Sequence, residues 1–396
     1  MLFFKKNYRS HLPFDSGKYI PGILDVMTEY DKKGIFVRLY YPTELKGNIE
    51  EYWDKWVPWI PGYHYVRGFS QVVMIWIIVV RFVMWLYSGV IHIPAVNGGK
   101  PKQNGKMKCI ILSHGLGGSR FFYSTICADL ASRGFLVAAI EHRDESCCST
   151  YYYSSEDDAK RGKRTFIEYA RINFGENHLP ARMRQVKYRS EECIKLINLI
   201  YAINEGRAPR NVLEDVQNER TETSLEAFHN CLDLSDITMM GHSFGGATSL
   251  LTLASDVRLK QGILLDPWMF PIKDETPIFE KLHQPLLFIN TQTFHIASNV
   301  NAMEKLLVKT DLSDRQMYTL LHTTHESQCD SPFVWGYWLN WFMKKLNPLT
   351  AIKINNCLIL RFLHKHVGFP SDIKTIEDYL SSQSPNVVEG LTKPWS

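Results

Sequence analysis

A serine flanked by two glycines is the feature of this sequence that points most directly to chemistry. Gly241, Ser243 and Gly245 form a G-x-S-x-G pattern between an apolar run, 237–240, and a helix-like run, 247–255. A sharp turn from strand to helix admits only small residues beside the serine, and it holds the hydroxyl over a helix N-terminus that favours negative charge. The pattern therefore indicates a nucleophilic serine, while an ordinary serine in a tight turn is the alternative that the motif alone leaves open.

A nucleophilic serine needs a base and an acid that orients the base. In an α/β-hydrolase these follow the serine in the order Asp or Glu, then His, each at the end of a later strand. Asp266 ends the run GILLD, and Pro267 cannot continue a central strand. His325 lies in the polar turn HTTHESQCD after the run MYTLL. We therefore expect Asp266 as the acid and His325 as the base. The weaker alternatives are Asp274 for the acid and His322 for the base.

The oxyanion hole of such an enzyme combines two backbone N–H groups. One belongs to the residue after the nucleophile, here Phe244, and the other to a loop after an earlier strand. The stretch CIILSHGLGGSR supplies that loop, because its glycines let backbone amides turn inward. We expect the second donor to be the N–H of Leu116.

The elements that position these residues read as alternating strands and helices. This alternation predicts an α/β-hydrolase fold, with a mostly parallel central sheet and helices on both of its faces. The expected helices are 123–132, 182–203 and 302–309. The expected strands are 35–41, 109–113, 135–141, 237–240, 261–265, 285–290 and 316–321.

Composition excludes several other classes of protein. The 396 residues are 45% hydrophobic and 22% charged, and we expect them to form a single domain, 1–396. A net charge of +4 is too small to indicate a nucleic-acid partner. Eight scattered cysteines fit a reducing compartment. No cluster of His, Cys or carboxylate residues has metal-ligand spacing, so we expect neither a metal nor a cofactor. The oligomeric state stays open.

Two segments stand apart from this pattern. The stretch 144–190 is polar and charged, and we expect it to leave the sheet and to lie near the active site. The stretch 72–91 is apolar, with twelve Val, Ile, Leu or Phe residues against one arginine, Arg81. A membrane crossing there would separate the run 35–41 from the other strands of its own sheet. We therefore expect a cap helix lying at a lipid interface, and the alternatives are a buried helix and a membrane span. The expected interfacial residues are Trp76, Arg81, Trp85 and Tyr87.

The joint set of motifs resembles a known family. HGLGG, then LASRGFLVAAIEHRDES, GHSFGGAT and GILLDPWMFP, and a histidine after a late β-run, are similar to the eukaryotic platelet-activating factor acetylhydrolases, the plasma and intracellular type II enzymes. The resemblance covers nearly the whole chain, from RLYYP to FLHKHVGF. It carries the nucleophile onto Ser243, the acid onto Asp266, the base onto His325 and the oxyanion donors onto Leu116 and Phe244. Two departures, Gly118-Ser119 and Pro267, remove no catalytic group.

The resemblance implies a serine-dependent, calcium-independent hydrolase. Its substrate would be a phospholipid with an acetyl, short or oxidatively truncated chain at the sn-2 position, bound at a membrane or lipid surface. The N-terminus MLFFKKNYRSHLPFD lacks a long apolar core and a glycine at position 2, so we expect cytoplasmic synthesis and peripheral membrane association. The alternatives are a hydrolase of another ester or thioester and a non-catalytic lipid-binding relative.

Overall fold

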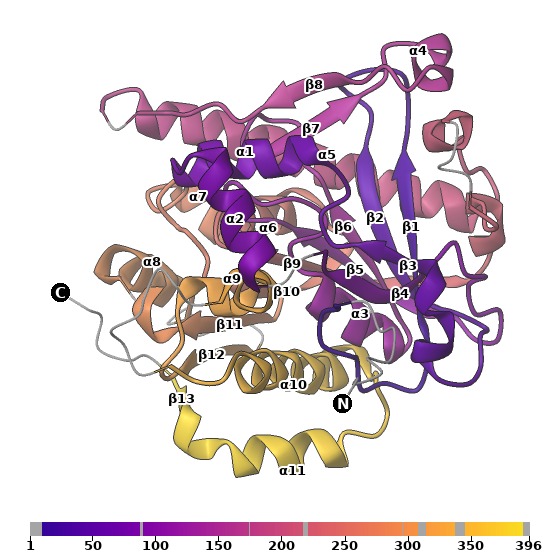
Figure 1. Cartoon of the computed structure of the whole chain (residues 1–396). Helices are drawn as coiled ribbons and strands as arrows, with labels where there is room; N and C mark the ends of the chain where they lie inside the picture. The colour runs from indigo at the N-terminus through magenta and orange to yellow at the C-terminus, as the bar shows by residue number, and fades with distance from the viewer. Residues whose placement is uncertain are drawn as a thin grey trace, which may run out of the picture.

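A computed structural model describes residues 10–87, 90–173, 175–216, 221–294, 296–307, 314–336 and 345–390. An 11-stranded sheet runs through the molecule, with the strand order β13-β12-β11-β10-β9-β5-β6-β2-β1-β4-β3 (Figure 1). Its strands are β1 (Pro21–Met27), β2 (Phe36–Pro42), β3 (Trp56–Pro58), β4 (His92–Asn97), β5 (Met107–Ser113), β6 (Phe135–Ile140), β9 (Leu232–His242), β10 (Leu259–Leu265), β11 (Leu286–Thr291), β12 (Arg315–Leu320) and β13 (Val387–Glu389).

The centre of the sheet is parallel. Strands β12, β11, β10, β9, β5 and β6 pair parallel with one another in that order, whereas β13 is antiparallel to β12 and β2 is antiparallel to both β6 and β1. The seven expected strands all lie in this sheet, which confirms the predicted fold class. Strands β1, β3, β4 and β13 of this sheet were not expected from the sequence. Proline stands at the first position of β1 and inside β4, at Pro94, and proline in a run argues against a strand.

Helices cover both faces of the sheet (Figure 1). Side chains of a strand point alternately to the two faces of its sheet, and in β5 they enter two separate core clusters. Ile110 and Leu112 belong to one cluster, and Cys109 and Ile111 belong to the other. The first cluster includes residues of α3 and α10, and the second includes residues of α5, α6 and α8. The helices are α1 (Tyr63–Val73), α2 (Ile77–Tyr87), α3 (Ser124–Ser132), α4 (Glu156–Lys160), α5 (His178–Asn204), α6 (Phe244–Ser255), α7 (Thr276–Lys281), α8 (Ala297–Leu307), α9 (Ser331–Trp335), α10 (Pro348–Val367) and α11 (Lys374–Ser382).

The polar stretch 144–190 forms a small unit of its own. It contains the hairpin of β7 (Ser149–Tyr152) and β8 (Thr165–Glu168), helix α4 and the beginning of α5, which starts at His178 and not at 182. This stretch supports the glycine-rich loop after β5, since the Ser146 carbonyl accepts a hydrogen bond from the N–H of Gly117 at 2.8 Å. It therefore lies beside the expected oxyanion loop.

The apolar stretch 72–91 is not one helix, and this part of the sequence prediction is wrong. Helix α1 ends at Val73, Met74 has a left-handed backbone with φ of 57°, and α2 begins at Ile77. The bend leaves both helices in contact with the core, since Phe69 on α1 and Met84 on α2 pack against the same core cluster. The backbone of Tyr87 is helical, but its side chain lies outside the part of the structure that is described.

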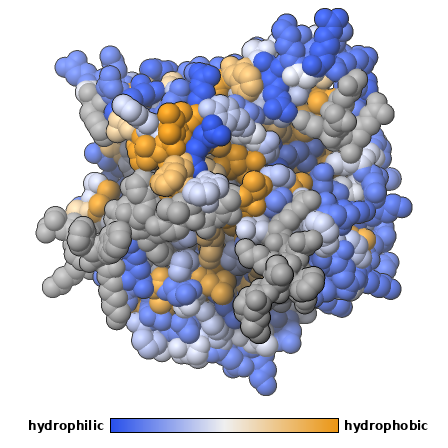
Figure 2. Space-filling view, viewed as in Figure 1, coloured by the Kyte–Doolittle hydropathy of each residue, from blue (hydrophilic) through white to orange (hydrophobic). Residues whose placement is uncertain are grey.

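Among the described residues, no single helix has both the length and the apolar composition to cross a membrane. Helices α1 and α2 together meet that criterion, but they are bent by 114° relative to each other. Helix α2 carries several exposed apolar side chains: Ile78, Val79, Phe82 and Trp85, and Trp76 precedes it with 80% of its surface exposed. Figure 2 shows hydrophobic residues gathered on the face of the molecule where this helix pair lies.

Candidate active site

Ser243 stands at the tight turn between β9 and α6. Its backbone has φ of 57° and ψ of −118°, an uncommon conformation for a residue with a side chain. A Cβ atom at Gly241 would lie 2.2 Å from the Gly245 carbonyl oxygen, and one at Gly245 would lie 2.0 Å from the Ser113 carbonyl oxygen. Both glycines are therefore required by close backbone approach, which is the geometry predicted from the motif.

The structure brings the expected acid and base together. His325 Nδ1 lies 3.0 Å from Asp266 Oδ2. Asp266 directly follows β10, and its buried carboxylate also accepts hydrogen bonds from the N–H and the hydroxyl of Thr291 at 2.6 and 2.5 Å. These contacts orient the carboxylate, which in turn orients the imidazole ring of His325.

Two further rings pack on the imidazole of His325. The Phe294 ring stacks on it with centroids 3.9 Å apart, and the His242 ring lies at 4.4 Å. Burial lowers the pKa of His325 to about 4 and that of His242 to about 3. Both rings are therefore neutral near pH 7, and a neutral His325 is able to accept a proton.

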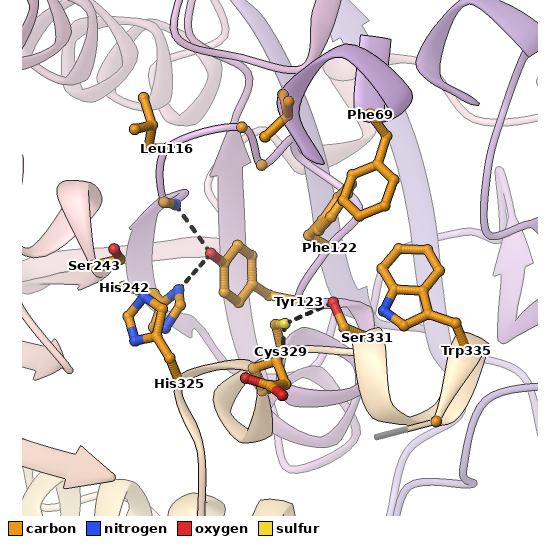
Figure 3. Close-up of a pocket in the computed structure, with 16 residues that line it drawn as sticks. Phe69, Leu116, Phe122, Tyr123, His242, Ser243, His325, Cys329, Ser331 and Trp335 are labelled. Atoms are coloured by element: carbon orange, nitrogen blue, oxygen red, sulfur yellow. Dashed lines mark hydrogen bonds between the residues drawn. The ribbon is translucent and has the colours of Figure 1, made fainter. Parts of the chain in front are cut away.

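A cavity of about 230 Å³ opens between these residues and a set of aromatic side chains (Figure 3). Ser243 and His325 both line it, on the side opposite Phe69 and Trp335. Within the described residues no hydrogen bond joins Ser243 to His325, and catalytic hydrogen bonds are often long before substrate binds. The lining residues are Phe69, Val72, Gly115, Leu116, Gly117, Gly118, Phe122, Tyr123, His242, Ser243, His325, Glu326, Cys329, Ser331, Trp335 and Gly336.

Of the two expected oxyanion donors, Leu116 lines this cavity, and Phe244 directly follows Ser243, which also lines it. The N–H of Phe244 is at the first position of α6, where no intrahelical acceptor exists, and Ser243 makes no side-chain cap to that helix. Hydrogen bonds hold the backbone amides of both chain neighbours of Leu116. Gly115 N–H donates to the Tyr123 hydroxyl, and Gly117 N–H donates to the Ser146 carbonyl. The loop is thus fixed on either side of the expected donor.

The alternatives for acid and base lie elsewhere. Asp274 is exposed, eight positions along the chain from the strand-end carboxylate Asp266. His322 does not line the cavity, and its backbone N–H donates to Gln292 Oε1 at 2.6 Å. Geometry therefore favours Asp266 and His325 over both alternatives.

Three residues at the site were not singled out from the sequence: Tyr123, His242 and Phe294. His242 occupies the variable position of G-x-S-x-G, so the motif itself placed it beside the serine without giving it a role. Tyr123 and Phe294 carried no such signal, because only the tertiary structure brings Tyr123 to the cavity and Phe294 to the ring of His325.

The acid, the base and His242 also have the spacing of metal ligands, with one atom of each lying within 4.8 Å of the others. The sequence showed no such cluster because these residues are far apart in the chain. Each group already has another partner. His325 Nδ1 contacts Asp266, and His242 Nδ1 lies 2.8 Å from the Tyr123 hydroxyl.

Comparison with known proteins identifies the family of this chain. The family model described as platelet-activating factor acetylhydrolase, isoform II, matches residues 4–387. The chain belongs to this family. It is 35% identical to the platelet-activating factor acetylhydrolase of Gallus gallus, over 98% of this chain and 90% of the relative. It is 34% identical to the protein of the same name from Bos taurus, over 96% of this chain and 83% of the relative. The resemblance expected from the motifs is confirmed.

Solved structures support the fold of this family member independently. A ferulic acid esterase from Streptomyces cinnamoneus superposes with a TM-score of 0.60 and 16% sequence identity, covering 96% of this chain and 99% of the esterase. At this identity the similarity concerns the fold alone. It confirms the α/β-hydrolase architecture.

Proposed function

We propose that the protein hydrolyses the sn-2 acetyl, short or oxidatively truncated acyl ester of platelet-activating factor and related phospholipids, without calcium. One observation carries the proposal: Ser243, Leu116 and His325 line one cavity, and Asp266 holds His325 from behind through its contact with Nδ1. Membership of the acetylhydrolase family supports a lipid ester as the substrate.

The reaction follows from the positions of these groups. His325 accepts the proton of Ser243 while the serine oxygen attacks the ester carbonyl, and Asp266 stabilises the imidazolium that forms. The N–H groups of Leu116 and Phe244 donate to the oxyanion, and each contributes about 3 to 4 kcal/mol to the lowering of the barrier. His325 then returns the proton to the leaving lysophospholipid alkoxide. Water, activated by the same histidine, hydrolyses the acetyl-enzyme and releases acetate.

Helices α1 and α2 support a lipid surface as the place of this reaction. Phe69 and Val72 on α1 line the cavity, and Trp76 and Trp85, which belong to the adjoining apolar surface, are largely exposed. Arg81 lies over the Tyr63 ring, with its guanidinium 5.6 Å from the ring centroid. We propose that the exposed apolar side chains of this helix pair enter the lipid interface, with Arg81 facing the headgroups, so that the cavity opens close to its substrate.

A panel of phospholipids that differ only in the sn-2 chain tests the proposal. We expect turnover of the acetyl and short-chain members, retained in the presence of EGTA, and labelling of Ser243 by a fluorophosphonate probe. Labelling without turnover of any phospholipid would favour a different ester or thioester as substrate. An unlabelled Ser243 would contradict serine-dependent hydrolysis and favour a non-catalytic lipid-binding protein.

A further inference from the structure

The hydroxyl group of Tyr123 connects two parts of the site that come from distant segments of the chain. It accepts a hydrogen bond from the backbone N–H of Gly115 at 3.0 Å, in the loop that carries Leu116. It also lies 2.8 Å from Nδ1 of His242, the residue before Ser243. Both contacts are drawn in Figure 3, and Tyr123 and His242 are both buried.

The direction of each hydrogen bond follows from the donors available. Gly115 N–H can only donate, so the Tyr123 oxygen accepts there, and the phenol proton is left for Nδ1 of His242. His242 is therefore the tautomer with its proton on Nε2. Burial raises the pKa of Tyr123 and lowers that of His242, which keeps the phenol protonated and the imidazole neutral.

The same histidine lies against the catalytic base. Its ring centroid is 4.4 Å from that of His325, with the ring planes tilted by 31°. The packing here is close. A Cβ atom added at Gly115 would lie 3.2 Å from Ser243 Cβ and 3.3 Å from both His242 Nδ1 and the Tyr123 hydroxyl. A shift of either side chain would thus be transmitted to the loop, the nucleophile and the base.

We propose that Tyr123 and His242 are positioning residues for ester hydrolysis, a role that rests on the proposed function. Tyr123 holds the Gly115 peptide, so that the next amide, that of Leu116, stays at the cavity wall as an oxyanion donor. His242 accepts a hydrogen bond from the Tyr123 hydroxyl and packs against one side of the His325 ring. Neither residue forms or breaks a bond with the substrate. Together they hold the oxyanion loop, the nucleophile turn and the base in one arrangement.

The first test replaces Tyr123 by Phe, which removes the acceptor for Gly115 N–H and keeps the ring. Loss of a whole oxyanion donor costs about 10² to 10³ in kcat. For a displaced donor we expect a loss in kcat of at least about tenfold on a water-soluble acetyl ester, with KM changed by less than about threefold. Tyr41→Phe is the matched control, because Tyr41 is equally buried and donates to the Gly99 carbonyl, away from the site. The control should keep the wild-type kcat.

The second test separates a positioning role from a purely structural one. In His242→Asn the amide oxygen can take the place of Nδ1 as acceptor for Tyr123, whereas His242→Leu offers no acceptor. We expect His242→Asn to recover at least about tenfold in kcat relative to His242→Leu, while the two variants have similar melting temperatures. Equal kcat values for the two variants, or a wild-type kcat in Tyr123→Phe, would overturn the proposal.

The rate at which a fluorophosphonate labels Ser243 provides a readout independent of the natural substrate. The positioning role predicts slower labelling in Tyr123→Phe and His242→Leu than in Tyr41→Phe, whichever ester the wild-type protein hydrolyses. Unchanged labelling rates in both variants would contradict the role of Tyr123 and His242. Absence of phospholipid turnover by a wild-type protein that labels normally would contradict only the proposed substrate.

Discussion

The Phe69 ring of α1 stacks on the Trp335 ring of α9, with centroids 4.6 Å apart and planes 23° apart (Figure 3). Both rings line the cavity on the side away from Ser243. On the proposed function, we expect this pair to limit how far an acyl chain extends from the serine. Phe122 joins the same wall, with its ring 5.9 Å from that of Phe69.

Truncating the aromatic side chains of this wall should change the preference for acyl-chain length. One methylene in an apolar pocket is worth about 1 to 3 kcal/mol. We therefore expect Phe69→Ala and Trp335→Ala to raise kcat/KM for longer sn-2 chains, relative to acetyl, by about tenfold or more. Phe166→Ala is a suitable control, since Phe166 is exposed on β8 and does not line the cavity. An unchanged ratio in both wall variants would show that another part of the protein sets chain length.

Replacing any member of the triad should abolish most hydrolysis. Ser243→Ala, Asp266→Asn and His325→Ala each break a unit that acts together, so we expect losses of about 10⁴-fold or more in kcat and little further loss in double mutants. Melting temperatures should show that the variants remain folded. His322→Ala should be mild, because His322 does not line the cavity. A severe loss of activity in His322→Ala together with a mild effect of His325→Ala would assign the base to His322.

The dependence of activity on pH should reflect the lowered pKa of His325. The neutral imidazole accepts the serine proton, so activity is lost as pH falls through the pKa of that group. Burial lowers this pKa from the ordinary value of about 6.5 to about 4. We expect kcat/KM on a soluble ester to stay level from about pH 8 to about pH 6 and to fall only at more acidic values. An acid limb centred near or above pH 6.5 would show that the pairing of His325 with Asp266 outweighs burial.

Removal of divalent cations should leave activity unchanged. In the proposed mechanism the amides of Leu116 and Phe244 meet the negative charge of the intermediate, so that step requires no ion. We expect the same kcat with EDTA or EGTA as with added calcium or zinc. Loss of activity with a chelator and its recovery with one cation would instead assign a metal to His242, Asp266 and His325, which have suitable spacing.

Vesicle binding should depend on the exposed aromatic residues of the helix pair. Each buried aromatic side chain contributes on the order of 2 kcal/mol, so Trp76→Ser and Trp85→Ser should each weaken co-sedimentation with phospholipid vesicles by about tenfold or more. Turnover of a soluble ester and the melting temperature should stay near wild type, because both side chains are largely exposed. Val257→Ser, at an exposed site between α6 and β10, is the control. Normal vesicle binding in both tryptophan variants would contradict an interfacial role for the helix pair.

Much of the site could be predicted from the sequence, because its parts are local patterns with a known order. The turn around Ser243 needs glycines at two fixed positions, and Asp266 is marked as a strand end by an apolar run followed by proline. Parallel strands bring their carboxyl ends to one edge of a sheet, so residues that follow different strands meet there whatever their separation in sequence. This is why the order Ser, Asp, His was sufficient to place the three groups.

Tertiary packing decided the rest. The run 72–91 contains no glycine or proline before position 89, so nothing local marks the break at Met74, after which Phe69 and Met84 pack against the same core. The Tyr123–His242 contact likewise depends on where α3 and β9 lie relative to each other. Periodicity in a sequence reports which face of an element is apolar, but not which distant side chain that face will meet. The sequence therefore determined the catalytic groups, while the folded structure determined the walls and supports that surround them.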